Sequence, residues 1–245
     1  IDAAGNVAIG TDNASEKLSI SSGNISLDSG YFVKFGTNNS RISTGGSNLV
    51  LQTGAVSRLI LDDNSRISLG NNDAGGDTTN TVFGRLAGAS ISTGGINNTV
   101  FGSEAGNDIS TGDKNTLIGY LAGDKLSTTS QNVVIGSAAG RGVGYADNVY
   151  IGYGVANSTS SNSSNNTLIG SGVALSGAMS GGDNTALGKS SLASITSGSS
   201  NVAVGVNSLT AITSADNNVV LGYNALTTAT TAYSNVVIGK DAMEQ

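Results

Sequence analysis

A five-residue motif recurs ten times after residue 79 and constrains the fold more than any other feature of this chain. It consists of Asn, then Thr or Val, then two mostly apolar residues, then Gly, and successive copies begin 16 to 18 residues apart. A unit of about 17 residues is too short for a helix pair or a propeller blade, but it suits one solenoid coil of two short strands and two turns. The sequence therefore predicts an all-β fold with a parallel β-solenoid of ten coils over residues 80–245.

The Asn and Gly residues of the motif are expected to serve the backbone. Gly can adopt a positive φ at a corner, and stacked Asn side chains can form an amide ladder along a rod. An alternative role of the Asn side chains as glycan ligands is disfavoured because the motif adjoins a core strand. The structural repeat residues are Asn80, Gly84, Asn98, Gly102, Asn115, Gly119, Asn132, Gly136, Asn148, Gly152, Asn166, Gly170, Asn184, Gly188, Asn201, Gly205, Asn218, Gly222, Asn235 and Gly239.

Both faces of the motif strand are apolar, although alternate side chains point to opposite faces. The first and third positions after Asn share one face, and we expect the larger residues before Gly to fill the lumen. The second position then faces outward, and a second apolar face indicates that it is covered by identical chains in a homotrimer. The expected trimer interface comprises Val82, Val100, Leu117, Val134, Leu168, Val220 and Val237.

Residues 1–79 lack the 17-residue phase and instead contain short segments of alternating apolar and polar residues. These segments predict strands, with Gly, Asn and Ser in the turns between them. Their spacing suits either a narrow intertwined β-prism that forms a shaft or a small β-domain, with a boundary near residues 71–80. The expected strands are 17–21, 24–28, 31–35, 48–52, 57–61 and 65–69.

The composition excludes several classes of chemistry. The 245 residues include no His, Cys, Pro or Trp, so Ser-His-Asp and Cys-His catalysis and most zinc sites are excluded. The net charge of −6 and the scattered basic residues make nucleic acid an unexpected partner. No apolar run is long enough for a membrane span, so membrane insertion is not expected. We expect no enzymatic activity and no cofactor.

Acidic residues are sparse, and we interpret most of them as solvated residues of turns, although two carboxylates are enough for glycoside hydrolysis. Those in the repeat are Glu104, Asp108, Asp113, Asp124, Asp147, Asp183, Asp216 and Asp241. The densest polar cluster is a candidate calcium site or an ordinary polar turn, and its spacing matches no full calcium loop. This cluster comprises Asp62, Asp63, Asn71, Asn72, Asp73 and Asp77.

The position directly after the motif Gly is occupied by large residues in several coils. Tyr at an exposed corner can stack on a sugar ring or anchor a protein contact, and the alternative is packing within the corner. The candidate binding residues are Tyr120, Tyr153 and Tyr223, and the other large residues at this position are Arg85, Lys189 and Lys240.

Two resemblances follow from these motifs. NVAVG at 201–205 and NVVIG at 235–239 resemble the head repeats of YadA-type trimeric autotransporter adhesins, whose consensus is close to NSVAIG. This resemblance implies a left-handed parallel β-roll trimer over residues 80–245. GNVAIGTDNASEKLSI at 5–20 is similar to a segment of bacteriophage tail fibres and tailspikes. In that family a C-terminal trimerising chaperone, removed by self-cleavage, often follows.

These expectations lead to a functional hypothesis with two alternatives. The chain is expected to be an extracellular segment of a phage tail fibre that attaches the virion to a glycan or protein of the bacterial surface. The first alternative is the head domain of an autotransporter adhesin on a bacterial cell, which would continue into a coiled coil and a membrane anchor. The second alternative is a polysaccharide-degrading tailspike.

Overall fold

The computed structural model describes the backbone of five strands in the first part of the chain and nearly all of the repeat region. The described residues are 32–35, 40–45, 48–53, 56–61, 67–69, 79–92, 94–142, 146–158, 163–175 and 179–243. The chain forms two compact units, Ile1–Ile67 and Ser68–Gln245, and the division falls within strand β5.

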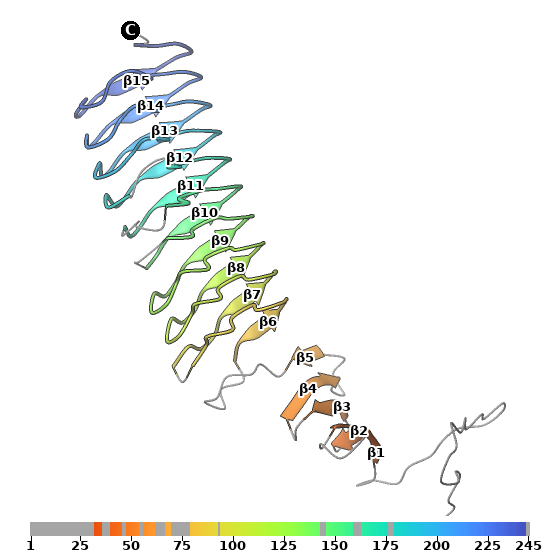
Figure 1. Ribbon diagram of the computed structural model, residues 1–245. Coiled ribbons are helices and arrows are strands. Elements are labelled where there is room, and N and C mark those ends of the chain that lie inside the picture. Colours follow the sequence, from red (N-terminus) through yellow and green to blue (C-terminus); the bar gives the residue numbers. More distant parts are fainter. Residues whose placement is uncertain are drawn as a thin grey trace, which may run out of the picture. The chain divides into compact units, whose positions relative to one another are not determined.

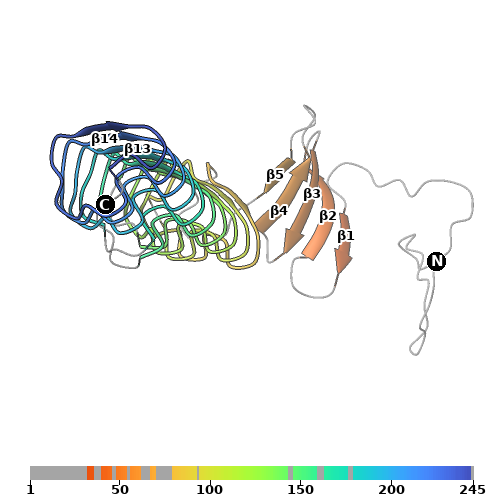
Figure 2. The same ribbon diagram turned by 90° about the horizontal axis from the view of Figure 1, so that it is seen from above.

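The first part of the chain forms a five-stranded sheet in the order β1-β2-β3-β4-β5 (Figure 2). The first four strands pair antiparallel in sequence, with a register shift between Leu51 and Gln52. Four of the expected strands are present, whereas β2 was not predicted and the segments 17–21 and 24–28 lie outside the described residues. The strands are β1 Phe32–Phe35, β2 Ser40–Gly45, β3 Asn48–Thr53, β4 Val56–Leu61 and β5 Ile67–Leu69.

The repeat forms a stack of ten parallel strands in sequence order, so the predicted β-solenoid is confirmed (Figure 1). Each motif supplies one three-residue strand, and equivalent residues of neighbouring coils pair directly. We name each coil by its strand. The strands are β6 Thr81–Phe83, β7 Thr99–Phe101, β8 Thr116–Ile118, β9 Val133–Ile135, β10 Val149–Ile151, β11 Thr167–Ile169, β12 Thr185–Leu187, β13 Val202–Val204, β14 Val219–Leu221 and β15 Val236–Ile238.

The expectation of two strands per coil was wrong for the described residues, because the side opposite the sheet consists of turns and loops. Backbone hydrogen bonds still join the coils there, for example from Gly106 N to Ala122 O at 2.9 Å and from Ser110 N to Ser127 O at 2.7 Å. Residues two and four positions after the motif Gly adopt positive φ in the β8 coil, at Leu121 and Gly123. A left-handed conformation at alternate residues bends the chain and prevents an extended second strand.

The core of the solenoid lies in its lumen and takes one side chain from each strand. The middle residue of the strand is buried, and the first and third residues are partly or fully exposed on the outer side. Small residues three positions after the motif Gly and apolar residues seven positions after it complete the core, as Ala122 and Leu126 do in the β8 coil. The middle residues are Val82, Val100, Leu117, Val134, Tyr150, Leu168, Ala186, Ala203, Val220 and Val237.

This burial overturns the expected orientation of the strands. Val100, Leu117, Val134, Leu168 and Val220 are 0% exposed within the single chain, and Val237 is 3% exposed, so none of these side chains can face another chain. Val82, in the first strand, is partly buried against the same core. The larger residues before Gly, which were expected in the lumen, point outward instead. Alternate side chains of a strand point to opposite faces, so a three-residue strand that turns its middle residue inward places both neighbouring residues outside.

Candidate functional site

The outer face of the ten-stranded sheet carries apolar side chains along the whole stack. We define this outer sheet face as the first and third residues of strands β6 to β15, which are all Thr, Val, Ile, Leu or Phe. No charged residue interrupts it, and it extends about 45 Å at the usual distance between strands. Scattered exposed apolar residues are ordinary, but a continuous stripe of this length is typical of an interaction surface.

Several side chains of the outer sheet face are largely exposed in the single chain. Phe83 and Phe101 are 55% and 53% exposed, and their rings stack with centroids 5.1 Å apart. Leu187 is 49% exposed, and Ile238 in the last strand is 67% exposed. The sequence argument for two apolar faces therefore stands, but the exposed face is the one that had been assigned to the lumen.

The ten motif Asn residues form a ladder along the N-terminal ends of the strands. In one step, the backbone N–H and the Nδ2 group of Asn115 both donate to Oδ1 of Asn98, at 2.9 and 3.0 Å. Asn115 Nδ2 also donates to the carbonyl of Thr129 at 2.9 Å. The backbone step recurs from Asn98 to Asn235, and the side chains from Asn80 to Asn218 are at most 3% exposed. These amides satisfy one another and the backbone, which leaves them no free surface for a ligand.

The motif Gly residues form the corner after each strand and allow neighbouring coils to stack closely there. Each has a φ between +132° and +148°, a region in which side chains are strained. A methyl group on Gly119 would lie 2.6 Å from the carbonyl oxygen of Gly136 in the next coil. The Gly therefore serves the spacing of the coils.

The three candidate tyrosines all lie on the surface. Tyr120, Tyr153 and Tyr223 are 52%, 68% and 48% exposed, so they do not pack into the corner of their own chain. The ammonium group of Lys240 lies 6.0 Å from the ring centroid of Tyr223. Tyr120 and Tyr153 are in the middle of the stack, and Tyr223 is close to its C-terminal end.

Most acidic residues of the repeat are partly buried, whereas Asp147 and Asp183 are exposed and Asp124 is buried. The Asp124 side chain is 4% exposed and pairs with Arg141 of the next coil at 3.3 Å. The neighbouring Lys125 pairs with Asp108 at 2.7 Å, and the hydrogen bond to this carboxylate raises the pKa of Lys125. Among the described residues, no three His, Cys, Asp or Glu side chains form a metal-binding group. The candidate calcium cluster at 62–77 lies outside the described residues.

Tyr150 in the β10 coil was not recognised as unusual from the sequence. It is fully buried in the lumen, and its hydroxyl has no hydrogen-bond partner of good geometry within the described part of the chain. Burial raises the pKa of Tyr150 to about 12, and the nearby side chains of Ser163 and Asn166 oppose this rise. The signal in the sequence was a lone aromatic residue at a position that is aliphatic in every other coil.

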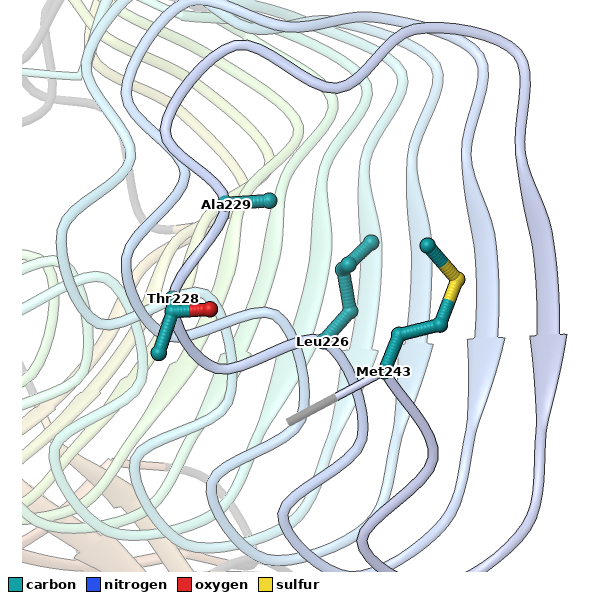
Figure 3. A pocket seen from close by; sticks show the side chains of 4 residues that line it. All are labelled: Leu226, Thr228, Ala229 and Met243. Atoms are coloured by element: carbon teal, nitrogen blue, oxygen red, sulfur yellow. The ribbon is translucent and has the colours of Figure 1, made fainter. Parts of the chain in front are cut away.

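One pocket of about 300 Å³ lies between the last two coils (Figure 3). It is lined by Leu226, Thr228, Ala229 and Met243, and these residues offer one hydroxyl group and no charge. The pocket continues the apolar lumen and contains no group suited to acid–base chemistry.

Comparisons with protein-family models, with curated proteins and with solved structures found no match to this chain. The described residues contain no helix of the length and apolarity that a membrane span requires.

Proposed function

We propose that this chain is a structural and adhesive fibre segment that assembles as a homotrimer and attaches a bacteriophage tail to the bacterial surface. The observation that carries this proposal is the outer sheet face, where every coil turns two uncharged, mostly apolar residues outward in register. Chains that bury this stripe against copies of themselves form a rigid rod, as a fibre requires.

A closed arrangement around one axis suits this surface better than stacking in an open array. The stripe runs parallel to the coil stack, so copies related by rotation about a parallel axis bring equivalent residues together along its whole length. Three copies shield three stripes in one central core. The arrangement leaves the turns and loops of each solenoid on the outside, where they are accessible to a cell surface.

Attachment is tested by adding the fluorescently labelled chain to a panel of Gram-negative and Gram-positive bacteria and measuring the label retained after washing. We expect retention on particular strains, because receptor recognition is selective. Ile135→Asp places a charge in the outer sheet face and is expected to give folded monomers. These monomers should be retained at least about ten-fold less, because three linked sites bind with avidity.

Ser197→Asp is the matched control, because it adds the same charge at an exposed loop position away from the outer sheet face. Ser197→Asp should bind like the unmodified chain. Retention on no strain of the panel would contradict an adhesive role. Equal retention of the Ile135→Asp monomer would contradict the contribution of the trimer.

A further inference from the structure

The residues directly after the motif Gly alternate over five consecutive coils. From β7 to β11 they are Ser103, Tyr120, Ser137, Tyr153 and Ser171, and we call them the corner row. Since coils stack at about 4.8 Å, the two tyrosines recur at about 10 Å with one serine between them.

Backbone hydrogen bonds show that the corner row keeps its register beyond the strands. Leu121 N donates to Ser103 O at 3.1 Å, and Ala138 N donates to Tyr120 O at 2.8 Å. Gly154 N donates to Ser137 O at 3.1 Å, and Gly172 N donates to Tyr153 O at 2.9 Å. The carbonyl groups of the row are therefore occupied by the next coil, and the side chains are what the row offers to a ligand.

The surroundings of the corner row are open and uncharged. Tyr153 is 68% exposed, and the small residues Ala138, Gly154 and Gly172 follow the row in three of its coils. The ion pair between Arg85 and Glu104 flanks one end, and Lys189 begins the next coil at the other end. From β8 to β11 neither the row nor the residues that follow it carry a charge.

We propose that the corner row binds an extended, uncharged, β-linked polysaccharide that runs parallel to the coil stack. This inference rests on the proposed attachment function and assigns its ligand class and site. Tyr presents a rigid, amphipathic ring that stacks on the apolar face of a pyranose. Ser137, between the two rings, supplies a hydroxyl group that donates to and accepts from sugar hydroxyls.

The spacing of the corner row matches this class of glycan. In an extended β-1,4-linked chain, successive rings alternate by half a turn and advance by a distance close to the coil spacing of about 4.8 Å. Every second ring therefore presents the same face at about the distance between Tyr120 and Tyr153. An α-linked chain that coils into a helix does not keep this match beyond one ring.

Other ligand classes fit the corner row less well. An anionic polysaccharide requires basic side chains, which the row lacks between β8 and β11, in a chain of net charge −6. A protein strand that adds to a sheet edge requires free carbonyl groups to accept its hydrogen bonds, but the carbonyl groups of the row already accept bonds from the next coil. A neutral glycan requires only stacking surfaces and hydroxyl groups.

The ligand class is tested by isothermal titration of the 245-residue chain with three soluble hexasaccharides. Cellohexaose and N-acetylchitohexaose are extended and β-linked, and maltohexaose is α-linked and helical. We expect at least one of the first two to bind at least about ten-fold more tightly than maltohexaose. Binding of neither β-linked probe, or equal binding of maltohexaose, would overturn the proposal.

The site is tested with variants of the two tyrosines. Tyr120→Ala and Tyr153→Ala should each weaken binding by about ten-fold or more, whereas Tyr153→Phe should retain most of it because the stacking face remains. Tyr223→Ala is the matched control, because it removes an exposed tyrosine from the same position of a distant coil. Equal loss for Tyr223→Ala would overturn the assignment of the corner row.

The spacing is tested by moving one tyrosine to the neighbouring coil. The double variant Ser137→Tyr/Tyr153→Ser keeps two tyrosines but places them about 5 Å apart. Its affinity should fall to that of Tyr153→Ala. Affinity equal to that of the unmodified chain would show that the distance between the rings does not matter, and this result would reject the proposed match.

The two proposals can fail separately. If the unmodified chain attaches to bacteria and Tyr120→Ala/Tyr153→Ala attaches equally well, the corner row is not the attachment site and the attachment function stands. If a β-linked hexasaccharide binds as expected but no bacterium retains the chain, the ligand site stands and the attachment function fails.

Discussion

The early β8 coil and the late β13 coil of the solenoid fill the lumen from opposite sides. In the early β8 coil, the middle residue of the strand is Leu117 and the residue four positions after the motif Gly is Gly123. In the late β13 coil, the middle residue is Ala203 and the equivalent turn residue is Leu209. Leu117, Ala203 and Leu209 are all 0% exposed. A large side chain on the sheet side is thus exchanged for one on the turn side.

The difference teaches that the lumen can be filled from either side, from the sheet by Leu117 or from the turn by Leu209. A methyl group on Gly123 would lie 2.8 Å from Leu117 Cδ2, so the early coil has no room for a side chain there. The backbone is the same in both coils, with φ of +58° at Gly123 and +55° at Leu209. The late coil accepts left-handed strain of about 1–2 kcal/mol at Leu, which burial of that side chain offsets.

The largest effect is expected when the late coil loses its turn-side filling. Leu209→Gly should lower the free energy of unfolding by about 3–5 kcal/mol, because Ala203 cannot fill the cavity that remains. Urea unfolding followed by circular dichroism measures this change. The matched control is Leu86→Gly, which has the same left-handed conformation but is 49% exposed, and it should be neutral or slightly stabilising. Equal destabilisation by both variants would show that conformation, and not filling, distinguishes the coils.

The reciprocal change overfills an early coil. Gly123→Leu should destabilise the chain by about 1–3 kcal/mol, because its side chain meets Leu117 and Leu126. Adding Leu117→Ala converts the β8 coil to the late pattern, and this second change should recover at least about 1 kcal/mol. A double-mutant cycle in urea measures the coupling. Additive effects would contradict the exchange of volume between the two sides.

The β10 coil lies between the two patterns and gives the smallest effect, at Tyr150. The folded-state pKa of Tyr150 is raised to about 12, while the unfolded chain ionises near its usual value of 10.0. Its contribution to stability is therefore full below pH 10 and is lost as the pH rises towards 12. Tyr150→Phe removes the unpartnered hydroxyl, so it should stabilise the fold by about 1 kcal/mol and reduce the loss above pH 10. An unchanged pH profile of unfolding would contradict the buried hydroxyl.

The repeat made the positions of the strands predictable, but not which face each strand turns inward. The Asn-to-Gly motif marks every strand of the stack, since its phase is kept from Asn80 to Asn235. Size was a poor guide to the lumen, because Ile135 lies outside while the small Ala203 lies inside. Because both faces of each three-residue strand are mostly apolar, polarity did not indicate which face points into the lumen either.

The prediction of a second strand on the side opposite the sheet was wrong for a different physical reason. The segment from Gly119 to Leu126 contains enough apolar residues for a short strand, but Leu121 and Gly123 adopt positive φ. Gly123 indicates a turn in the sequence, because Gly favours positive φ. Leu209, at the equivalent position of the β13 coil, gives no such indication. The Ser and Tyr residues of the corner row could be identified in the sequence. The distance between the two tyrosines could not be predicted, because it depends on the register between coils.

The central claim is that the chain assembles through the outer sheet face. The most direct test is the native mass of the unmodified chain and of two variants at the adjacent positions 134 and 135. The outer sheet face predicts an assembly of about 73 kDa, three times the 24.2 kDa chain. Ile135→Asp should give a folded 24.2 kDa monomer, whereas Val134→Asp should lose the β signal in circular dichroism because the charge is buried in the lumen. A folded monomer of the unmodified chain, or an Ile135→Asp variant that still assembles, would contradict the account.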